Sequence, residues 1–201
     1  MSIVKLNNRS VKDITQFGSI SSLGSLTHIA TQTASSSSSI NFTSGIDSTY
    51  KEYIFYFVNI HPATDSADIM INFSIDGGSN YNVTKTGTHF RAYHDEGGSA
   101  TSLAYDSSND IAQGTGDLNI LLNIGNGNDE CGSGFLHLFD PSNTTFVKHY
   151  TAQTHHSHEA DLPVNFFKSG YGNTTSAVDA IQFSMSSGNI DSGDIVLYGI
   201  N

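Results

Sequence analysis

The sequence predicts an all-β protein, and three observations support this prediction. Residues 53–60 form a nearly unbroken run of β-branched and aromatic residues that ends at His61. Such a run is typical of a strand that is buried on both faces or nearly so. Residues 68–75 alternate between apolar and polar side chains before a turn begins at Asp76, which indicates a half-buried strand. No segment has a convincing helical periodicity.

The other expected strands are short, and each is bounded by Gly, Asn, Asp or Ser. Two strands, at residues 27–33 and 38–43, surround a serine run and are expected to form a hairpin. Further strands are expected at residues 82–84, 89–94, 117–124, 134–139, 146–154, 164–168, 177–185 and 194–200. About ten to twelve short strands with polar connections predict a two-sheet antiparallel sandwich of jelly-roll or Greek-key type.

The chain of 201 residues has the length of one large sandwich. We expect residues 26–201 to form this β-sandwich domain. Residues 1–25 scatter apolar side chains among Ser, Asn and Gly, which predicts an extended N-terminal docking arm. Because the last expected strand runs almost to residue 201, we expect nothing to follow the domain. The long connection at residues 95–116 is expected to be a loop with a functional or assembly role.

Charge is distributed unevenly along the chain. The formal net charge of -11 argues against nucleic acid and anionic membranes as partners. The first twelve residues contain Lys5, Arg9 and Lys12 and no acidic residue, so they carry +3 and the rest of the chain carries -14. This pattern predicts an arm that docks through these cations and through Leu6 and Val11, and a solvated terminus is the alternative.

No apolar stretch approaches the roughly 18 residues of a membrane span, and the N-terminus lacks the apolar run of a signal peptide. We therefore expect no membrane insertion. Cys131 is the only cysteine, so no internal disulfide is possible.

A histidine cluster is the first candidate for metal binding. His156, His158 and Glu159 are ligand types that suit a divalent metal. On a strand, His156 and His158 would share a face and His155 would point away. The polar stretch that continues to Pro163 favours an exposed loop with a solvated or interface role over a metal site.

A second candidate site lies on the strand expected at residues 89–94. His89, Arg91 and Tyr93 share one face of this strand. Aromatic rings stack on sugar rings and arginine donates hydrogen bonds to hydroxyls, so this face is a candidate for glycan contact. The same face also suits contact with a neighbouring subunit.

Signals for enzymatic activity are weak throughout the chain. The sequence contains no nucleophile elbow, zinc-protease motif, phosphate-binding glycine loop or dinucleotide fingerprint. Residues 76–80 and 126–130 bring carboxylate and amide oxygens together as in a calcium loop, but ordinary turn chemistry explains the same residues. We expect a protein that is not an enzyme and that needs no cofactor.

Three segments resemble known proteins. The segments 44–64 (SGIDSTYKEYIFYFVNIHPAT), 73–81 (FSIDGGSNY) and 186–200 (SSGNIDSGDIVLYGI) resemble a group of small β-rich virion proteins from tailed bacteriophages of aquatic bacteria. The resemblance covers most of residues 26–201 and brings no catalytic motif with it. It implies a structural component of the virion, assembled in the host cytoplasm, that contacts other virion proteins and forms a homo-oligomer, with a trimer favoured.

Two functions are compatible with these observations. The first is a structural protein that decorates the capsid or the tail and docks through its N-terminal arm. The second is a receptor-binding module of a fibre or tail tip that contacts host surface glycan through polar loops.

Overall fold

The structure, a computed structural model, describes residues 26–200, and these contain strands and no helix. The all-β prediction is therefore confirmed. The strands are β1 (Leu26–Thr33), β2 (Ser39–Phe42), β3 (Glu52–Pro62), β4 (Ala67–Ser74), β5 (Lys85–His94), β6 (Thr101–Tyr105), β7 (Ile111–Gly114), β8 (Leu118–Ile124), β9 (Gly132–Phe139), β10 (Lys148–His158), β11 (Leu162–Gly172), β12 (Ala180–Met185) and β13 (Ile190–Ile200). Within this range, no helix has the length and hydrophobicity required to cross a membrane.

The strands form one antiparallel sheet that is nearly closed into a barrel. The main path runs β1-β13-β3-β9-β10-β8-β4-β12-β2, and β11 extends it from β10 to β5, which pairs with β6 and β7. Between β10 and β8 the register contains a single pair, His158 with Ile124. The sheet therefore has two well-paired parts that are joined by this short pairing, one formed by β8, β4, β12 and β2 and the other by the remaining strands.

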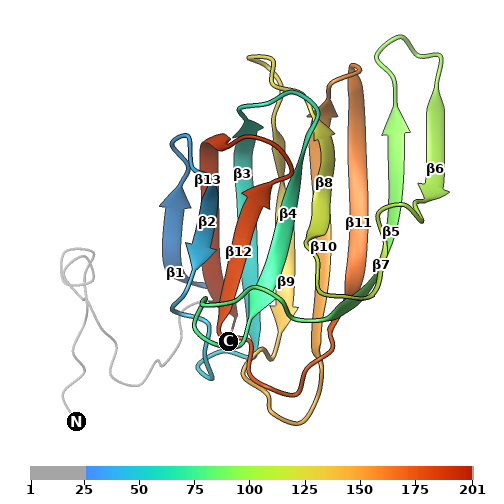
Figure 1. The fold of residues 1–201 in the computed structure, drawn as a ribbon. Coiled ribbons are helices and arrows are strands. Elements are labelled where there is room, and N and C mark those ends of the chain that lie inside the picture. The colour runs from blue at the N-terminus through green and yellow to red at the C-terminus, as the bar shows by residue number, and fades with distance from the viewer. Residues whose placement is uncertain (1–25, 201) are drawn as a thin grey trace, which may run out of the picture.

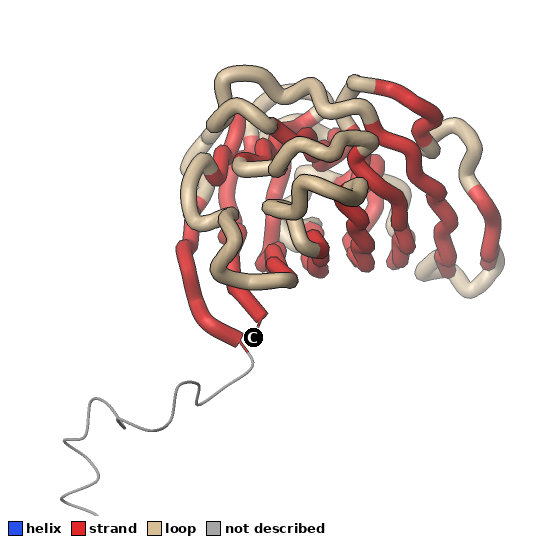
Figure 2. Tube along the Cα trace, turned by 90° about the horizontal axis from the view of Figure 1, so that it is seen from below, coloured by secondary structure: helices blue, strands red, loops and turns tan. Residues whose placement is uncertain are grey.

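The two parts face each other across the hydrophobic core. The strands β2, β12, β4 and β8 lie in front of β13, β3, β9 and β10 (Figure 1), and the view from below shows the strands following a curve (Figure 2). The Phe183 ring from β12 lies 5.4 Å from Phe55 and 5.5 Å from Phe57, both in β3. Contacts between aromatic rings at such distances stabilise a core beyond the area that they bury.

The strands expected at residues 53–60 and 68–75 are present as β3 and β4. One face of β3 is fully buried, whereas the other is only partly covered, and Val58 is 44% exposed. The strand β4 ends at Ser74, and Ile75 lies in the following turn and is exposed. The strand β3 therefore has an inner face in the core and an outer face that reaches the surface.

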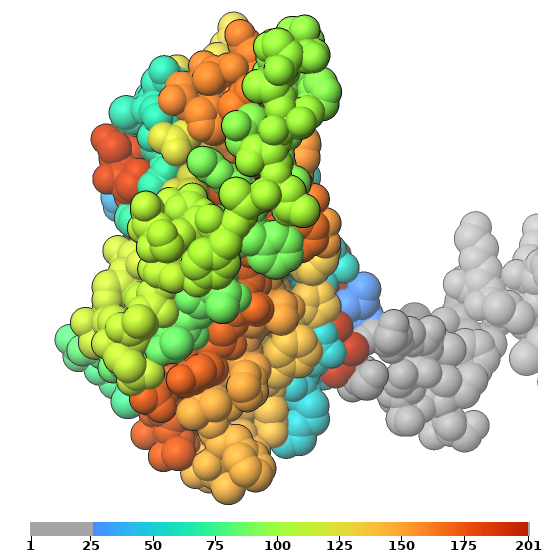
Figure 3. All heavy atoms as spheres, turned by 90° about the vertical axis from the view of Figure 1, so that its right-hand side faces the viewer, coloured from blue at the N-terminus to red at the C-terminus, as the bar shows by residue number. Residues whose placement is uncertain are grey.

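Two sequence predictions in the middle of the chain are wrong. The segment 95–116, expected to be a loop, contains β6 and β7, and both pair with β5 at the end of the sheet. Edge strands with exposed side chains lack the alternation that identifies a half-buried strand. The strand expected at residues 82–84 is absent, because pairing begins at Lys85. Figure 3 shows β5, β6 and β7 in green along this side of the molecule.

Three lysines, Lys85, Lys148 and Lys168, are buried on the inner face and donate hydrogen bonds to oxygens of loops and neighbouring strands. Lys85 Nζ donates to Asn72 Oδ1 at 2.6 Å and to the Val83 carbonyl at 2.8 Å. Lys168 Nζ donates to the Asn109 carbonyl at 2.8 Å. Burial lowers the pKa of Lys85 and of Lys168 to about 8. These ammonium groups tie the loops to the sheet, because each supplies donors for carbonyls that strand pairing leaves unpaired.

Candidate binding surfaces

The residues predicted for glycan contact lie on the inner face of β5. His89 is 1% exposed and its ring lies 4.8 Å from the Phe166 ring, so it is not available to a ligand at the surface. Arg91 is partly exposed, with Nε 4.0 Å from Asp106 Oδ2 and its guanidinium carbon 5.9 Å from the Tyr93 ring. Within this trio, only Arg91 and Tyr93 are partly exposed.

The histidine cluster lies in the last residues of β10, not in an exposed loop as the sequence predicted. His156 is 0% exposed and stacks on Phe166, whereas His155 is exposed on the opposite face, as expected for a strand. His158 Nδ1 lies 2.7 Å from Glu159 Oε2. Within residues 26–200, no group of three or more His, Cys, Asp or Glu side chains is arranged to hold a metal ion.

The arm residues Lys5, Leu6, Arg9, Val11 and Lys12 lie outside the described residues. Each of the two turns that resemble calcium loops uses one carboxylate internally. Asp76 accepts hydrogen bonds from Ser74 and Asn80, and the bonds from Asn80 lower the pKa of Asp76 to about 2. In the second turn, Glu130 Oε2 accepts a hydrogen bond of 2.6 Å from the Gly127 amide.

The outer face of the sheet carries a row of aromatic residues. Inner positions of these strands, such as Phe55, Leu136 and Phe166, are buried in the core, so their neighbours in sequence point outward. Strand pairing places one outward residue of each strand in the same row: Val196 in β13, Tyr56 in β3, Phe135 in β9, Gln153 in β10, Phe167 in β11, Phe90 in β5 and Tyr105 in β6. Five of these seven side chains are aromatic.

A shallow groove interrupts this row at Gln153. The groove has a volume of about 250 Å³ and is lined by Phe90, Phe135, Thr151, Ala152, Gln153, Phe167, Lys168 and Ser169. Phe90 and Phe167 stack nearly parallel on one side, with their centroids 4.8 Å apart and 9° between their planes. Phe135 forms the other side. Because Phe135 and Phe167 are two strands apart, their backbones are separated by about 10 Å.

A larger cavity of about 490 Å³ lies at the end of β9. It is lined by Phe139, Asp140, Asn143, Thr145, Phe146, Val147, His149 and Thr175. Phe146 is 68% exposed, although the loop around it is well fixed. An exposed aromatic ring on a fixed loop is typical of an anchor for a protein partner. We call this surface the Phe146 cavity.

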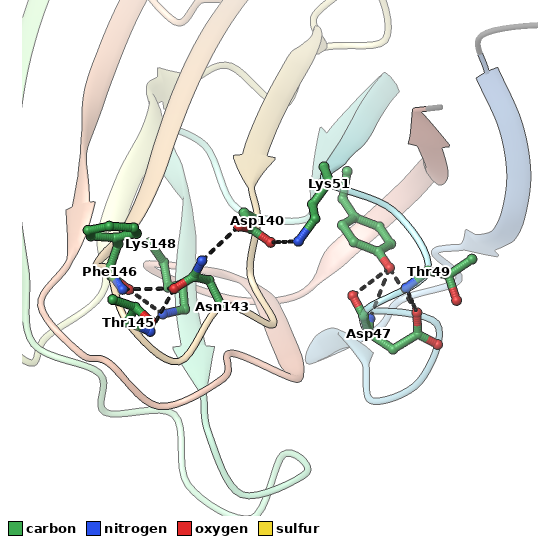
Figure 4. Close-up of polar contacts among 9 residues, drawn as sticks. Asp47, Thr49, Lys51, Asp140, Asn143, Thr145, Phe146 and Lys148 are labelled. Carbon is green, nitrogen blue, oxygen red and sulfur yellow. Dashed lines mark hydrogen bonds and ion pairs between the residues drawn. The ribbon is translucent and has the colours of Figure 1, made fainter.

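Polar contacts fix the loop of the Phe146 cavity (Figure 4). Asn143 Oδ1 accepts hydrogen bonds from the amides of Thr145 at 2.7 Å and Phe146 at 2.8 Å, and Asn143 Nδ2 donates to Asp140 at 2.9 Å. The other Asp140 oxygen pairs with Lys51 Nζ at 2.9 Å. Hydrogen bonds from both partners lower the pKa of Asp140, with that from Lys51 the largest cause.

A third hollow, of about 440 Å³, is acidic. Its lining includes Asp95, Glu96, Asp129, Glu130 and Asp161, together with His94 and His158. Asp95 serves a turn, because its oxygens accept hydrogen bonds from Ser99 and from the Ala100 amide. The bond from the Ser99 side chain is the main cause that lowers the pKa of Asp95. Local turn structure therefore explains the carboxylates of Asp95 and of Glu130, which accepts from the Gly127 amide.

Sequence reasoning missed both the outer groove and the Phe146 cavity. The alternation of residues 89–94 places Phe90 on the face opposite His89, which was the only available signal. The groove depends on which strands are neighbours, and the sequence does not give that order. Comparison of the chain with protein-family models, with curated proteins and with solved structures finds no match.

Proposed function

We propose that this chain is a non-enzymatic structural protein on the surface of a virus particle, on the capsid or the tail. The resemblance of residues 44–64, 73–81 and 186–200 to phage virion proteins supports the virion part of the proposal. We further propose that the domain is a two-sheet sandwich with jelly-roll or Greek-key winding. Support for this finer class comes from the facing strands and from the single pair that joins β10 to β8.

The Phe146 cavity is the observation that carries the assembly role. An exposed aromatic side chain contributes most to a protein contact when its backbone is already fixed, because little entropy is then lost on binding. Asn143 fixes the backbone of Phe146 through two amide hydrogen bonds. The partner that we propose is another virion protein or another copy of the chain, with a trimer favoured, and residues 1–25 provide a second point of attachment.

Two variants test this proposal separately. Deletion of residues 1–15 is expected to leave a folded domain that no longer joins particles. Phe146→Ala is expected to reduce incorporation, whereas Leu103→Ala is the matched control, because Leu103 is 74% exposed on β6. Incorporation is measured by quantifying the protein in purified particles, and thermal unfolding shows that each variant is folded. Normal incorporation of the deletion variant would contradict the proposal for the arm.

A second candidate function is supported by the aromatic row. Exposed aromatic residues on a sheet face suit contact with sugars. The protein would then be a receptor-binding module of a fibre or tail tip that contacts host surface glycan. Substitutions in the aromatic row distinguish this function from the first. They are expected to abolish binding to host cells while incorporation into particles stays normal.

A further inference from the structure

The groove at Gln153 combines two aromatic sides with a polar floor. Phe135 lies on one side, and the Phe90 and Phe167 pair lies on the other. Between them, Gln153 presents an amide that has both donors and an acceptor. No other residue within the range 26–200 hydrogen-bonds to this amide, so it is free to bind a ligand. Thr151 and Ser169 add hydroxyl groups to the lining.

This combination matches the chemistry of a pyranose sugar. A pyranose ring has apolar C–H faces that stack on aromatic rings and a rim of hydroxyls that exchange hydrogen bonds with an amide. Binding sites for small ligands typically have mostly apolar walls and few polar groups, which fix the orientation of the ligand. The separation of about 10 Å between the backbones of Phe135 and Phe167 suits an oligosaccharide of several units that extends from one ring to the other.

The charged groups around the groove indicate whether it favours neutral or acidic sugars. No carboxylate lines it, and the ammonium group of Lys168 points inward to the carbonyl of Asn109 at 2.8 Å. The groove therefore offers no cation for a carboxylate or sulfate group. The net charge of -11 for the whole chain also repels anionic ligands. Both observations favour a neutral sugar over an acidic one.

We propose that the groove binds a neutral oligosaccharide, with one pyranose unit against Phe135 and another unit of the same chain against Phe167, and with Gln153 hydrogen-bonded between them. This inference rests on the second proposed function, the contact with host glycan, and it names the site and the ligand class. It does not depend on the Phe146 cavity or on the N-terminal arm.

The test uses the full chain and a panel of neutral and acidic oligosaccharides. Glycan-array screening is followed by calorimetric titration with the neutral oligosaccharide that binds most tightly. Phe135→Ala and Phe167→Ala are each expected to weaken binding about tenfold or more, as for residues at the centre of an interface. Phe135→Tyr and Phe167→Tyr keep the ring and are expected to bind normally. Leu103→Ala, at an exposed position outside the groove, is the control for which affinity remains unchanged.

The outcomes separate this inference from the proposed functions. Binding of acidic glycans only, or no glycan binding by the folded chain, would overturn it. Neutral binding that both alanine variants retain would leave the receptor role intact and show that the site lies elsewhere. If the unsubstituted chain binds no sugar and both alanine variants lose self-association, the inference is overturned and the aromatic row is an interface between copies. Particle incorporation, measured in parallel, reports on the assembly role alone.

Discussion

The ring of His156 lies flat against the ring of Phe166, with centroids 5.3 Å apart and planes within 3° of parallel. Phe166 lies in β11, which pairs with β10 on one side and with β5 on the other. The ring of His89, in β5, lies 4.8 Å from the same Phe166 ring. Within the described range, neither nitrogen of either histidine has a hydrogen-bond partner. A buried imidazole without partners is stable only when it is neutral, because its charged form loses the solvation that water provides.

Acid is therefore expected to destabilise the protein. Burial lowers the pKa of His89 to about 4 and that of His156 to about 3, whereas an unfolded histidine titrates near pH 6.5. The charge of Lys168 adds to the shift of His89, and His158 and His155 add to that of His156. The unfolded chain binds more protons below pH 6.5, so stability is full above this pH and is lost as the pH falls toward 4.

The expected loss is about 2 kcal/mol per histidine at pH 5. Urea unfolding at pH 7 and pH 5 measures it. His156→Leu is expected to remove about half of the difference between the two pH values, and His149→Leu, at an exposed position of the same strand, is expected to leave it unchanged. Equal stability of the unsubstituted chain at both pH values would contradict this account.

The aromatic core is expected to determine most of the stability of the domain. Phe183 contacts Phe42, Phe55 and Phe57, so Phe183→Ala removes contacts between the facing strands and leaves a cavity. The expected cost is about 3 to 5 kcal/mol in the free energy of unfolding, measured by chemical denaturation. Leu103→Ala, at an exposed position, is expected to change stability by less than about 0.5 kcal/mol.

Gly134 is expected to tolerate no side chain. Its φ angle is 153°, and a Cβ atom there would lie 2.4 Å from the carbonyl oxygen of Gln153 and 2.6 Å from the Cα atom of Thr154. Gly134→Ala is expected to cost about 2 to 4 kcal/mol, because the backbone of β10 has to move. Gly116→Ala is the control, since a Cβ atom at Gly116 meets no atom within 4 Å. Similar melting temperatures for the two variants would contradict this expectation.

Asn143→Ala is expected to loosen the loop of the Phe146 cavity. The change removes the acceptor for the amides of Thr145 and Phe146 and a donor to Asp140. A loss of about 1 to 2 kcal/mol is expected, with faster hydrogen exchange at both amides. Thr144→Ala changes an exposed neighbour in the same loop and is expected to leave the exchange of Thr145 and Phe146 unchanged.

The sequence predicted the all-β class and most strands, because strands such as β3 and β4 carry dense β-branched and aromatic residues. The prediction failed where a polar side chain is buried in the core. His156 belongs to a polar segment that looks like a loop, yet the strand continues and places its ring in the core. The groove was not predictable, because Phe135 and Phe167 meet only through the order in which distant segments pair.

The single register pair between β10 and β8, His158 with Ile124, is flanked by two backbone hydrogen bonds, from the Glu159 amide to the Asn123 carbonyl and from the Gly125 amide to the Ser157 carbonyl. The two parts also meet through Thr154 Oγ1, which donates to the Ile120 carbonyl at 2.6 Å, and through core side chains such as Phe183 and Phe55. Substitutions that change the volume of this core are thus expected to shift the strands that carry its side chains. Because the same strands carry the outer aromatic row, such a shift would reach that surface although no residue on it is altered.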